Sequence, residues 1–315
     1  MTRIVLLVLA MCLAGCATAT PKVAAPVIEP RAVALYDGRT GARVEWEAMT
    51  SAVSQADVLL IGENHGHPLG LPSAAALWDD VLSRSDRAVL ALEFVERHEQ
   101  ADLDDYLAGI TDEAAFTKAA NRSPGNYPPA HRAMVEAAKK AKRPVIAANA
   151  PRRYVRLART SGYDRLASLT PEQRRLFRIP DALPTGKYRE EFDKVMSPMT
   201  HTPAVSMTST QAPPPESESA RRARLDSTFR SQSLWDWTMA ESVAGAMAQG
   251  GPVVLVVGRF HVDHEGGLVQ ALRAMRPAAR VVVLSYVNAA VPSALAETDR
   301  GRADFVAYVG PSAPE

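Results

Sequence analysis

Cysteine is nearly absent from this sequence of 315 residues. Its two cysteines, Cys12 and Cys16, both lie within the first sixteen positions. If an N-terminal signal is removed and Cys16 is acylated, no free thiol remains. A disulfide framework and a thiolate metal site are then excluded. Any metal must be held by histidine, carboxylate or tyrosine side chains.

An excess of charge of one sign is also absent. Once Arg3 leaves with the signal, 35 basic and 35 acidic side chains remain. Proteins that bind nucleic acids need a strongly basic surface to neutralise the phosphates. The sequence therefore predicts no nucleic-acid partner.

The apolar run near the N-terminus, residues 4–13, is too short to span a bilayer. It follows Arg3 and ends in LAGC, residues 13–16, which resembles the bacterial lipobox. The resemblance implies removal of a signal peptide, residues 1–15, and attachment of lipid such as palmitate to Cys16. Ala17 stands where an aspartate usually retains lipoproteins at the inner membrane. We therefore expect a lipid anchor in the outer membrane, facing the periplasm.

The rest of the chain predicts one α/β domain. Residues 16–31 form the lipidated cysteine and a proline-rich tether, and residues 32–310 form the domain, which begins with a hairpin at 32–46. Several short runs are continuously apolar, as in strands buried on both faces of a parallel sheet. These runs are 57–62, 88–94, 143–150, 252–258 and 280–286. Amphipathic helical patterns lie between them, which predicts an open, mainly parallel sheet flanked by helices.

One region interrupts this alternation. Residues 155–230 contain charged helical patterns and a stretch rich in Pro, Ser and Thr at 197–220, which has too few apolar residues for a core. We predict a helical insertion here, between the third and fourth main strands.

Chemically active side chains follow the predicted strands. Gly-Glu-Asn-His ends the first run at His65, and Gly-Arg-Phe-His ends the fourth at His261. Ligands bind outside the carboxyl ends of parallel strands. If these strands are neighbours, Glu63 and Glu93 join the two histidines in one crevice. Such a set suits a divalent metal that activates water, or a metal-free hydrolase based on His and Glu.

Other polar residues near these ends allow two interpretations. Glu93 is either part of the crevice or a cap for the next helix. His67 and His264 are interpreted as supporting or solvated residues. Arg152 and Arg153 follow the third strand, where they either form a surface pair or hold carboxylates or propionates by forked hydrogen bonds.

Several long blocks resemble the ChaN-like family of bacterial haem-binding lipoproteins. They include LLIGENHGHP, LALEFVERHEQADLDDYLAG, NYPPAHRAMVEAAKKAKRPVIAANAPRR, SQSLWDWTMAESVA and VVLVVGRFHVDHEGGLVQAL, which cover most of residues 55–275. The paired Gly-x-x-His motifs are distantly similar to the superfamily of Tiki, TraB and the erythromycin esterases. The family resemblance implies haem as cofactor, a tyrosine iron ligand and a homodimer that sandwiches two haems. It points to Tyr127, Tyr188 and His201 as candidate haem contacts.

Two functions remain open at this point. The first is a periplasm-facing lipoprotein that binds haem for iron acquisition. The alternative is a hydrolase, metal-dependent or based on His and Glu, that uses Glu63, His65, Glu93 and His261. A scaffold with a vestigial site is the third interpretation.

Overall fold

The computed structural model describes residues 29–198 and 216–311. In this part of the chain, eight strands form one sheet in the order β2-β1-β8-β7-β3-β6-β4-β5. The strands are β1 (Ala34–Asp37), β2 (Arg43–Val44), β3 (Val58–Glu63), β4 (Val89–Glu96), β5 (Val145–Asn149), β6 (Val253–Gly258), β7 (Val281–Val287) and β8 (Phe305–Tyr308). The five predicted parallel strands are confirmed as β3 to β7. The predicted hairpin is β1 and β2, and it reaches the rest of the sheet through β8.

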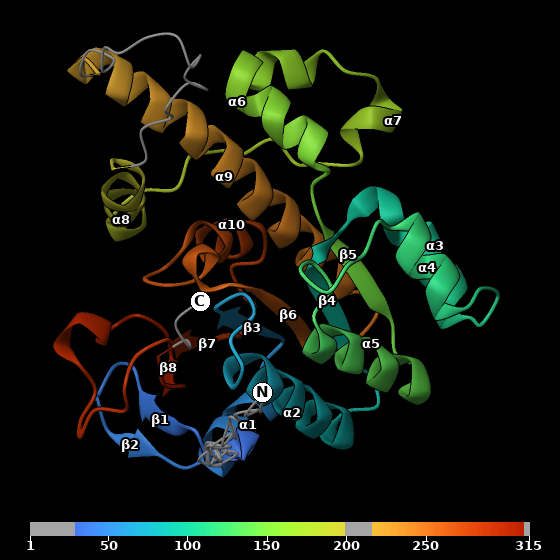
Figure 1. The fold of residues 1–315 in the computed structure, drawn as a ribbon, viewed down its shortest axis with the longest axis vertical. Coiled ribbons are helices and arrows are strands. Elements are labelled where there is room, and N and C mark those ends of the chain that lie inside the picture. The colour runs from blue at the N-terminus through green and yellow to red at the C-terminus, as the bar shows by residue number, and fades with distance from the viewer. Residues whose placement is uncertain (1–28, 199–215, 312–315) are drawn as a thin grey trace, which may run out of the picture.

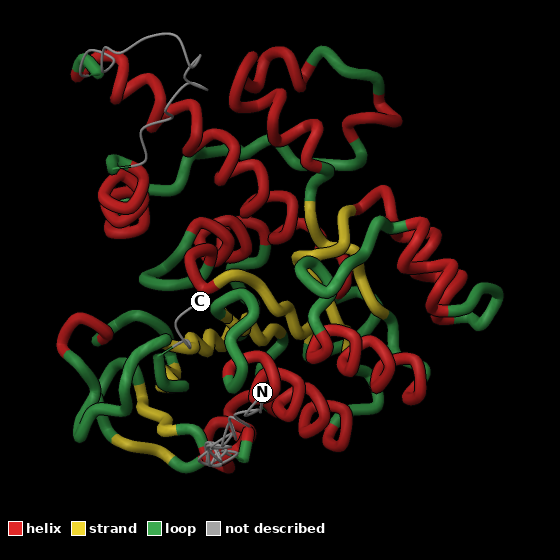
Figure 2. The backbone as a smooth tube through the Cα atoms, in the orientation of Figure 1, coloured by secondary structure: helices red, strands yellow, loops and turns green. Residues whose placement is uncertain are grey.

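Helices cover both faces of this sheet (Figures 1 and 2). They are α1 (Trp46–Ser54), α2 (Gly70–Arg84), α3 (Gln100–Leu107), α4 (Glu113–Ala119), α5 (Pro129–Ala141), α6 (Arg152–Ala167), α7 (Pro171–Arg174), α8 (Lys187–Met196), α9 (Glu218–Ala246) and α10 (Gly267–Met275). Short 3-10 turns are η1 (Pro30–Ala32), η2 (Arg97–Glu99), η3 (Arg259–His261) and η4 (Glu297–Asp299).

The alternation of side chains along β3 explains the two apolar layers. Val58 and Leu60 pack with α9 and α10, whereas Leu59 and Ile61 pack with α2 and α5 on the opposite face. Successive residues of a strand point to opposite faces. A strand buried on both faces must therefore be apolar at every position, which is what made these strands recognisable.

The segment between β5 and β6 contains α6, α7, α8 and α9. Helix α9 is continuous through the predicted end of the insertion at residue 230. Its first half lies among α6 and α8, and its second half packs on the sheet through Trp237, Ala240 and Val243 (Figure 1). Much of the Pro/Ser/Thr-rich stretch lies outside the described residues, as does the signal peptide with Cys16. Among the helices that are described, none combines the length and apolarity that crossing a membrane requires.

Candidate functional site

The carboxyl ends of β3, β6 and β4 meet at one edge of the sheet. Strands β3 and β6 are parallel neighbours, and Glu63 is level with Gly258 in their register. Strand β4 lies on the other side of β6 and brings Glu93 to the same edge. The structure thus brings together the four side chains that follow these strands. These are Glu63, His65, Glu93 and His261.

The glycines of the two Gly-x-x-His motifs each make room for the other motif. A Cβ at Gly62 would lie 2.6 Å from Val262 Cγ2 and 2.9 Å from Arg259 Cα. A Cβ at Gly258 would lie 3.2 Å from His65 Nε2 and 3.6 Å from Glu93 Oε2. A side chain at Gly62 would therefore clash with the backbone of the second motif, and one at Gly258 would displace the His65 ring slightly. The glycine of each Gly-x-x-His motif thus allows the ends of β3 and β6 to pack closely.

Substitution of Gly62 by alanine is therefore expected to destabilise the fold by about 1–3 kcal/mol, because the backbone of η3 must shift. Urea unfolding followed by circular dichroism measures this change. Gly125→Ala is the control, since a Cβ at Gly125 would meet only Ser123 Oγ, at 3.9 Å. Equal stability of the two variants would contradict the close packing of β3 and η3.

His261 is held from behind by a buried carboxylate that the sequence analysis missed. Its Nδ1 donates to Asp236 Oδ1 at 2.5 Å, and Asp236 Oδ2 accepts from the Tyr188 hydroxyl at 2.7 Å. Asp236 and Tyr188 are both almost fully buried. A histidine that donates one ring nitrogen to a carboxylate has a fixed orientation. The other nitrogen, Nε2, faces Glu93 Oε1 at 3.5 Å.

Charge in this network favours a protonated His261. Burial opposes the imidazolium, but the carboxylates of Asp236 and Glu93 outweigh it and raise the pKa of His261 to about 10. Burial likewise opposes the carboxylate form of Glu93. Its hydrogen bond and attraction to His261 prevail and lower the pKa of Glu93 to about 2. Its Oε2 also accepts from the Gly258 amide at 2.6 Å. Glu93 therefore belongs to the crevice, while Glu96 and Glu99 cap η2.

His65 forms the second His–carboxylate pair of the crevice. Its Nδ1 lies 2.5 Å from Glu63 Oε1, and the hydrogen bond to Glu63 raises the pKa of His65. The His65 side chain is 55% exposed, whereas Glu63 is buried and its Oε2 has no hydrogen-bond partner. Burial raises the pKa of Glu63. The His65 ring is therefore partly open to solvent, and its Nδ1 is occupied by Glu63.

The histidine and carboxylate side chains of the crevice are of the types that bind a divalent metal. Their arrangement, however, does not form a metal-binding site. Across residues 29–198 and 216–311, no group of three or more His, Cys, Asp or Glu side chains is arranged to hold a metal ion. Each Nδ1 is instead paired with its own carboxylate. The predicted metal role of Glu63, His65, Glu93 and His261 thus gains no support from the geometry.

These side chains open into a cleft of about 770 Å³, which we call the strand-end cleft. Its lining includes the aromatic rings of Phe94 and Trp235 and the polar side chains of Asn149 and Arg152, beside His65, Glu93 and His261. The Phe94 ring lies between two imidazoles, 4.9 Å from His65 and 4.9 Å from His131. The cleft thus combines aromatic surfaces with a polar floor.

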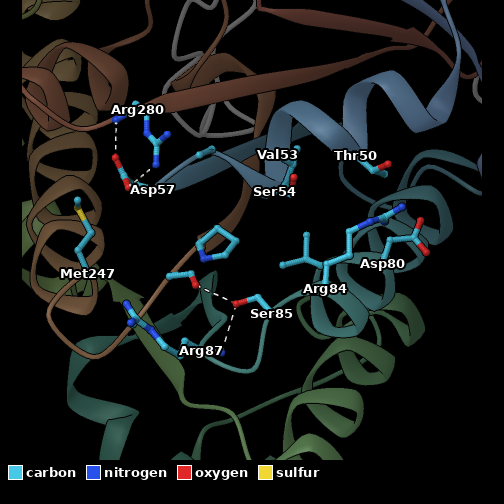
Figure 3. A pocket seen from close by; sticks show the side chains of 15 residues that line it. Thr50, Val53, Ser54, Asp57, Asp80, Arg84, Ser85, Arg87, Met247 and Arg280 are labelled. Atoms are coloured by element: carbon cyan, nitrogen blue, oxygen red, sulfur yellow. Dashed lines mark hydrogen bonds and ion pairs between the residues drawn. The ribbon is translucent and has the colours of Figure 1, made fainter.

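A smaller hollow of about 320 Å³ lies at the opposite edge of the sheet (Figure 3). Figure 3 shows the Arg280–Asp57 ion pair on one side and Ser85 bonded to the backbone on the other. None of the predicted site residues lines this hollow. The strand-end cleft is therefore the candidate functional site.

Comparison with known proteins identifies the family. A family model described as "Haem-binding uptake, Tiki superfamily, ChaN" matches residues 49–272. This chain belongs to that family. A structure of ChaN of Campylobacter jejuni that describes cofacial haem binding is similar, with a TM-score of 0.63 and 17% identity over 87% of this chain and 96% of that chain. At this identity the likeness concerns the fold alone.

More remote folds are similar as well. The erythromycin esterase mutant EreC in its open conformation has a TM-score of 0.45 and 12% identity, covering 80% of this chain and 76% of its own. A Bacillus cereus protein has a TM-score of 0.47 and 11% identity, covering 85% and 92%. No protein with curated function matches the chain significantly.

The tyrosines to which the ChaN resemblance points are both buried in this member of the family. Tyr127 packs edge-on against Phe116 and its hydroxyl has no partner, whereas the Tyr188 hydroxyl donates to Asp236. Burial raises the pKa of both phenols, which opposes the tyrosinate form that ferric haem favours. Neither residue lines the strand-end cleft. His201 lies outside the described residues.

Of the remaining candidate residues in this ChaN-family chain, some line the cleft and others do not. Arg152 lines the cleft, but the Arg153 guanidinium lies over the Tyr154 ring, 4.8 Å from its centroid. His67 is buried, and its Nδ1 accepts from the Gly70 amide at the start of α2, so its role is structural. Burial lowers the pKa of His264, which lies outside the cleft lining.

Proposed function

We propose that this protein binds haem in the strand-end cleft and serves iron acquisition as a lipid-anchored protein of the outer membrane, facing the periplasm. The observation that carries the proposal is an aromatic and polar cleft of about 770 Å³ in a chain of the ChaN family. The LAGC stretch supports the anchor. The cofacial haems of the Campylobacter jejuni protein support a homodimer in which two haems face each other.

The residues of the cleft fit this cofactor. The partly exposed His65 would offer Nε2 as an iron ligand, and Glu63, which pairs with Nδ1, would fix the ring and raise the basicity of the ligand. Haem in such a site would supply a ligand-binding and redox-active iron. Phe94 and Trp235 offer apolar surface to a porphyrin. His65 is therefore a candidate iron ligand in addition to Tyr127 and Tyr188, which do not line this cleft.

A haem titration followed by the Soret band tests the proposal. We expect saturable binding by the wild-type protein. His65→Ala is expected to weaken it by roughly tenfold or more, and Tyr127→Phe to change it little. If Tyr127→Phe or Tyr188→Phe instead abolishes the tyrosinate spectrum, the tyrosine is the ligand. Absence of any band with wild-type protein would rule out haem binding.

Two further measurements test the location and the assembly. Cys16→Ala is expected to abolish palmitate labelling in cells and to release the protein from outer-membrane fractions. Analytical ultracentrifugation with and without haem is expected to show a monomer that becomes a dimer. Labelling that persists in Cys16→Ala would contradict the anchor.

A second function is favoured by one specific observation, the fixed orientation of His261 between Asp236 and Glu93. A protonated His261 can donate a proton or stabilise a developing oxyanion, while His65, supported by Glu63, accepts a proton from water. We infer a hydrolase based on His and Glu as the alternative, because a carboxylate orients each of the two histidines. Hydrolysis of a panel of nitrophenyl esters that is lost in both His65→Ala and His261→Ala would support it. Activity unchanged in both variants would exclude it.

A further inference from the structure

Helix α6 begins at the wall of the strand-end cleft. Its first residue, Arg152, lines the cleft, and its N-cap, Pro151, has no side chain that caps the helix. The first amides of a helix have no intrahelical acceptor, and the helix dipole favours negative charge beside them. The start of a helix does not by itself indicate which ligand binds there. The neighbouring side chains determine the kind of ligand.

An amide side chain and an unpaired indole donor lie in the same wall. Asn149 is only 9% exposed, and its Oδ1 accepts from the Ala150 amide. The indole Nε1 of Trp235 is buried and lacks a partner. Both residues line the cleft. Buried donors normally find an acceptor, so a ligand that carries acceptors would supply one for the Trp235 indole.

The charges around this wall leave Arg152 available. Its nearest acid is Glu96, and the Nε–Oε1 distance of 3.8 Å is too long for a hydrogen bond. The Arg152 side chain is 82% exposed. The other acids at the cleft have closer partners: Glu99 pairs with Arg122, and Glu93 accepts from the Gly258 amide. Only Glu96 therefore competes with a bound anion.

We propose that the start of α6, with Arg152, Asn149 and Trp235, is a subsite for a carboxylate of the ligand. A carboxylate offers only acceptors and forms forked hydrogen bonds with arginine. In the haem-binding function proposed above, on which this assignment rests, the group would be a propionate. The subsite would then orient the porphyrin in the cleft.

Titrations with haem and with its dimethyl ester test the subsite. Arg152→Ala is expected to weaken haem binding by roughly tenfold, the value of one charge-assisted hydrogen bond, and to leave ester binding unchanged. Arg156→Ala is the matched control, because Arg156 lies one turn further along α6 and does not line the cleft. Equal affinity for haem and ester, with Arg152→Ala and Arg156→Ala indistinguishable, would overturn the subsite while leaving haem binding intact.

Binding of benzoate tests the carboxylate subsite even if haem does not bind. Benzoate is expected to change the tryptophan fluorescence of the wild-type protein, and the uncharged benzamide is not. The change should be lost in Trp235→Phe and weakened in Arg152→Ala. A response to benzoate without haem binding would keep the subsite and remove the haem function. No response to either benzoate or haem would overturn both.

Discussion

Replacement of Asp236 by asparagine is expected to lower the free energy of unfolding by about 3–5 kcal/mol at pH 7. The variant keeps the shape of the side chain but leaves the buried imidazolium of His261 without its nearest counter-charge. The Tyr188 hydroxyl also loses a charged acceptor. Urea unfolding of wild type and variant measures the difference.

Asp226→Asn is the matched control for this experiment. Asp226 lies on the same helix and pairs with Arg189, but its side chain is 44% exposed. A pair of this kind is worth about 0–1 kcal/mol. A deficit no larger for Asp236→Asn than for Asp226→Asn would show that the buried network does not stabilise the fold.

The deficit of Asp236→Asn should also depend on pH. His261 has a pKa raised to about 10 from its usual value of 6.5, so its contribution to stability is complete below pH 6.5. It is lost as the pH rises through 10, where the folded protein also releases the proton. The difference between wild type and variant should therefore shrink toward pH 10. A difference that stays constant from pH 7 to 10 would contradict a charged His261.

The second large effect is expected at His131, in the acid range. His131 is fully buried, neither ring nitrogen has a partner, and burial lowers its pKa to about 4 from 6.5. The unfolded chain therefore binds a proton in a pH range where the folded protein does not. Stability should fall by about 3 kcal/mol as the pH decreases from 6.5 to 4, and this loss should level off below 4.

His131→Leu removes this titration and should flatten the acid part of the stability curve. At pH 7 the substitution should be nearly neutral or stabilising, because two unpaired polar atoms leave the core. Denaturant unfolding at a series of pH values measures both effects. His98→Gln is the control, since it removes an exposed histidine. Parallel curves for wild type and His131→Leu would show that folding does not lower the pKa of His131.

The strands of the sheet could be predicted because each has a recognisable pattern within a short stretch of sequence. Strands such as β3 are apolar at every position, and each is followed by glycine and polar residues, so the two histidine motifs could be placed at strand ends. That β3 and β6 are neighbours could only be assumed, since pairing depends on the whole topology. The repeated Gly-x-x-His spacing was the indirect sign of it.

The residues behind the crevice could not be predicted in the same way. Asp236 and Tyr188 lie on helices, where an acid or a phenol usually indicates an exposed face, and no sequence spacing relates them to His261. The only local sign was a carboxylate between two tryptophans in the stretch SLWDW, where an apolar residue would be the ordinary choice. Tyr127 and Tyr188 were assigned through resemblance alone, and that could not reveal their burial.

The packing of the two glycine motifs against each other also determines when the site forms during folding. Gly62 packs against Arg259 and Val262, Gly258 lies beside His65, and the two motifs are separated by most of the polypeptide. During synthesis, His65 leaves the ribosome long before β6 does. Glu63 and His65 are therefore present for some time without His261. Contacts so distant in sequence are slow to form, because a long loop must close before they do. The crevice is therefore a late product of folding, and a nascent chain that ends before β6 cannot carry its function.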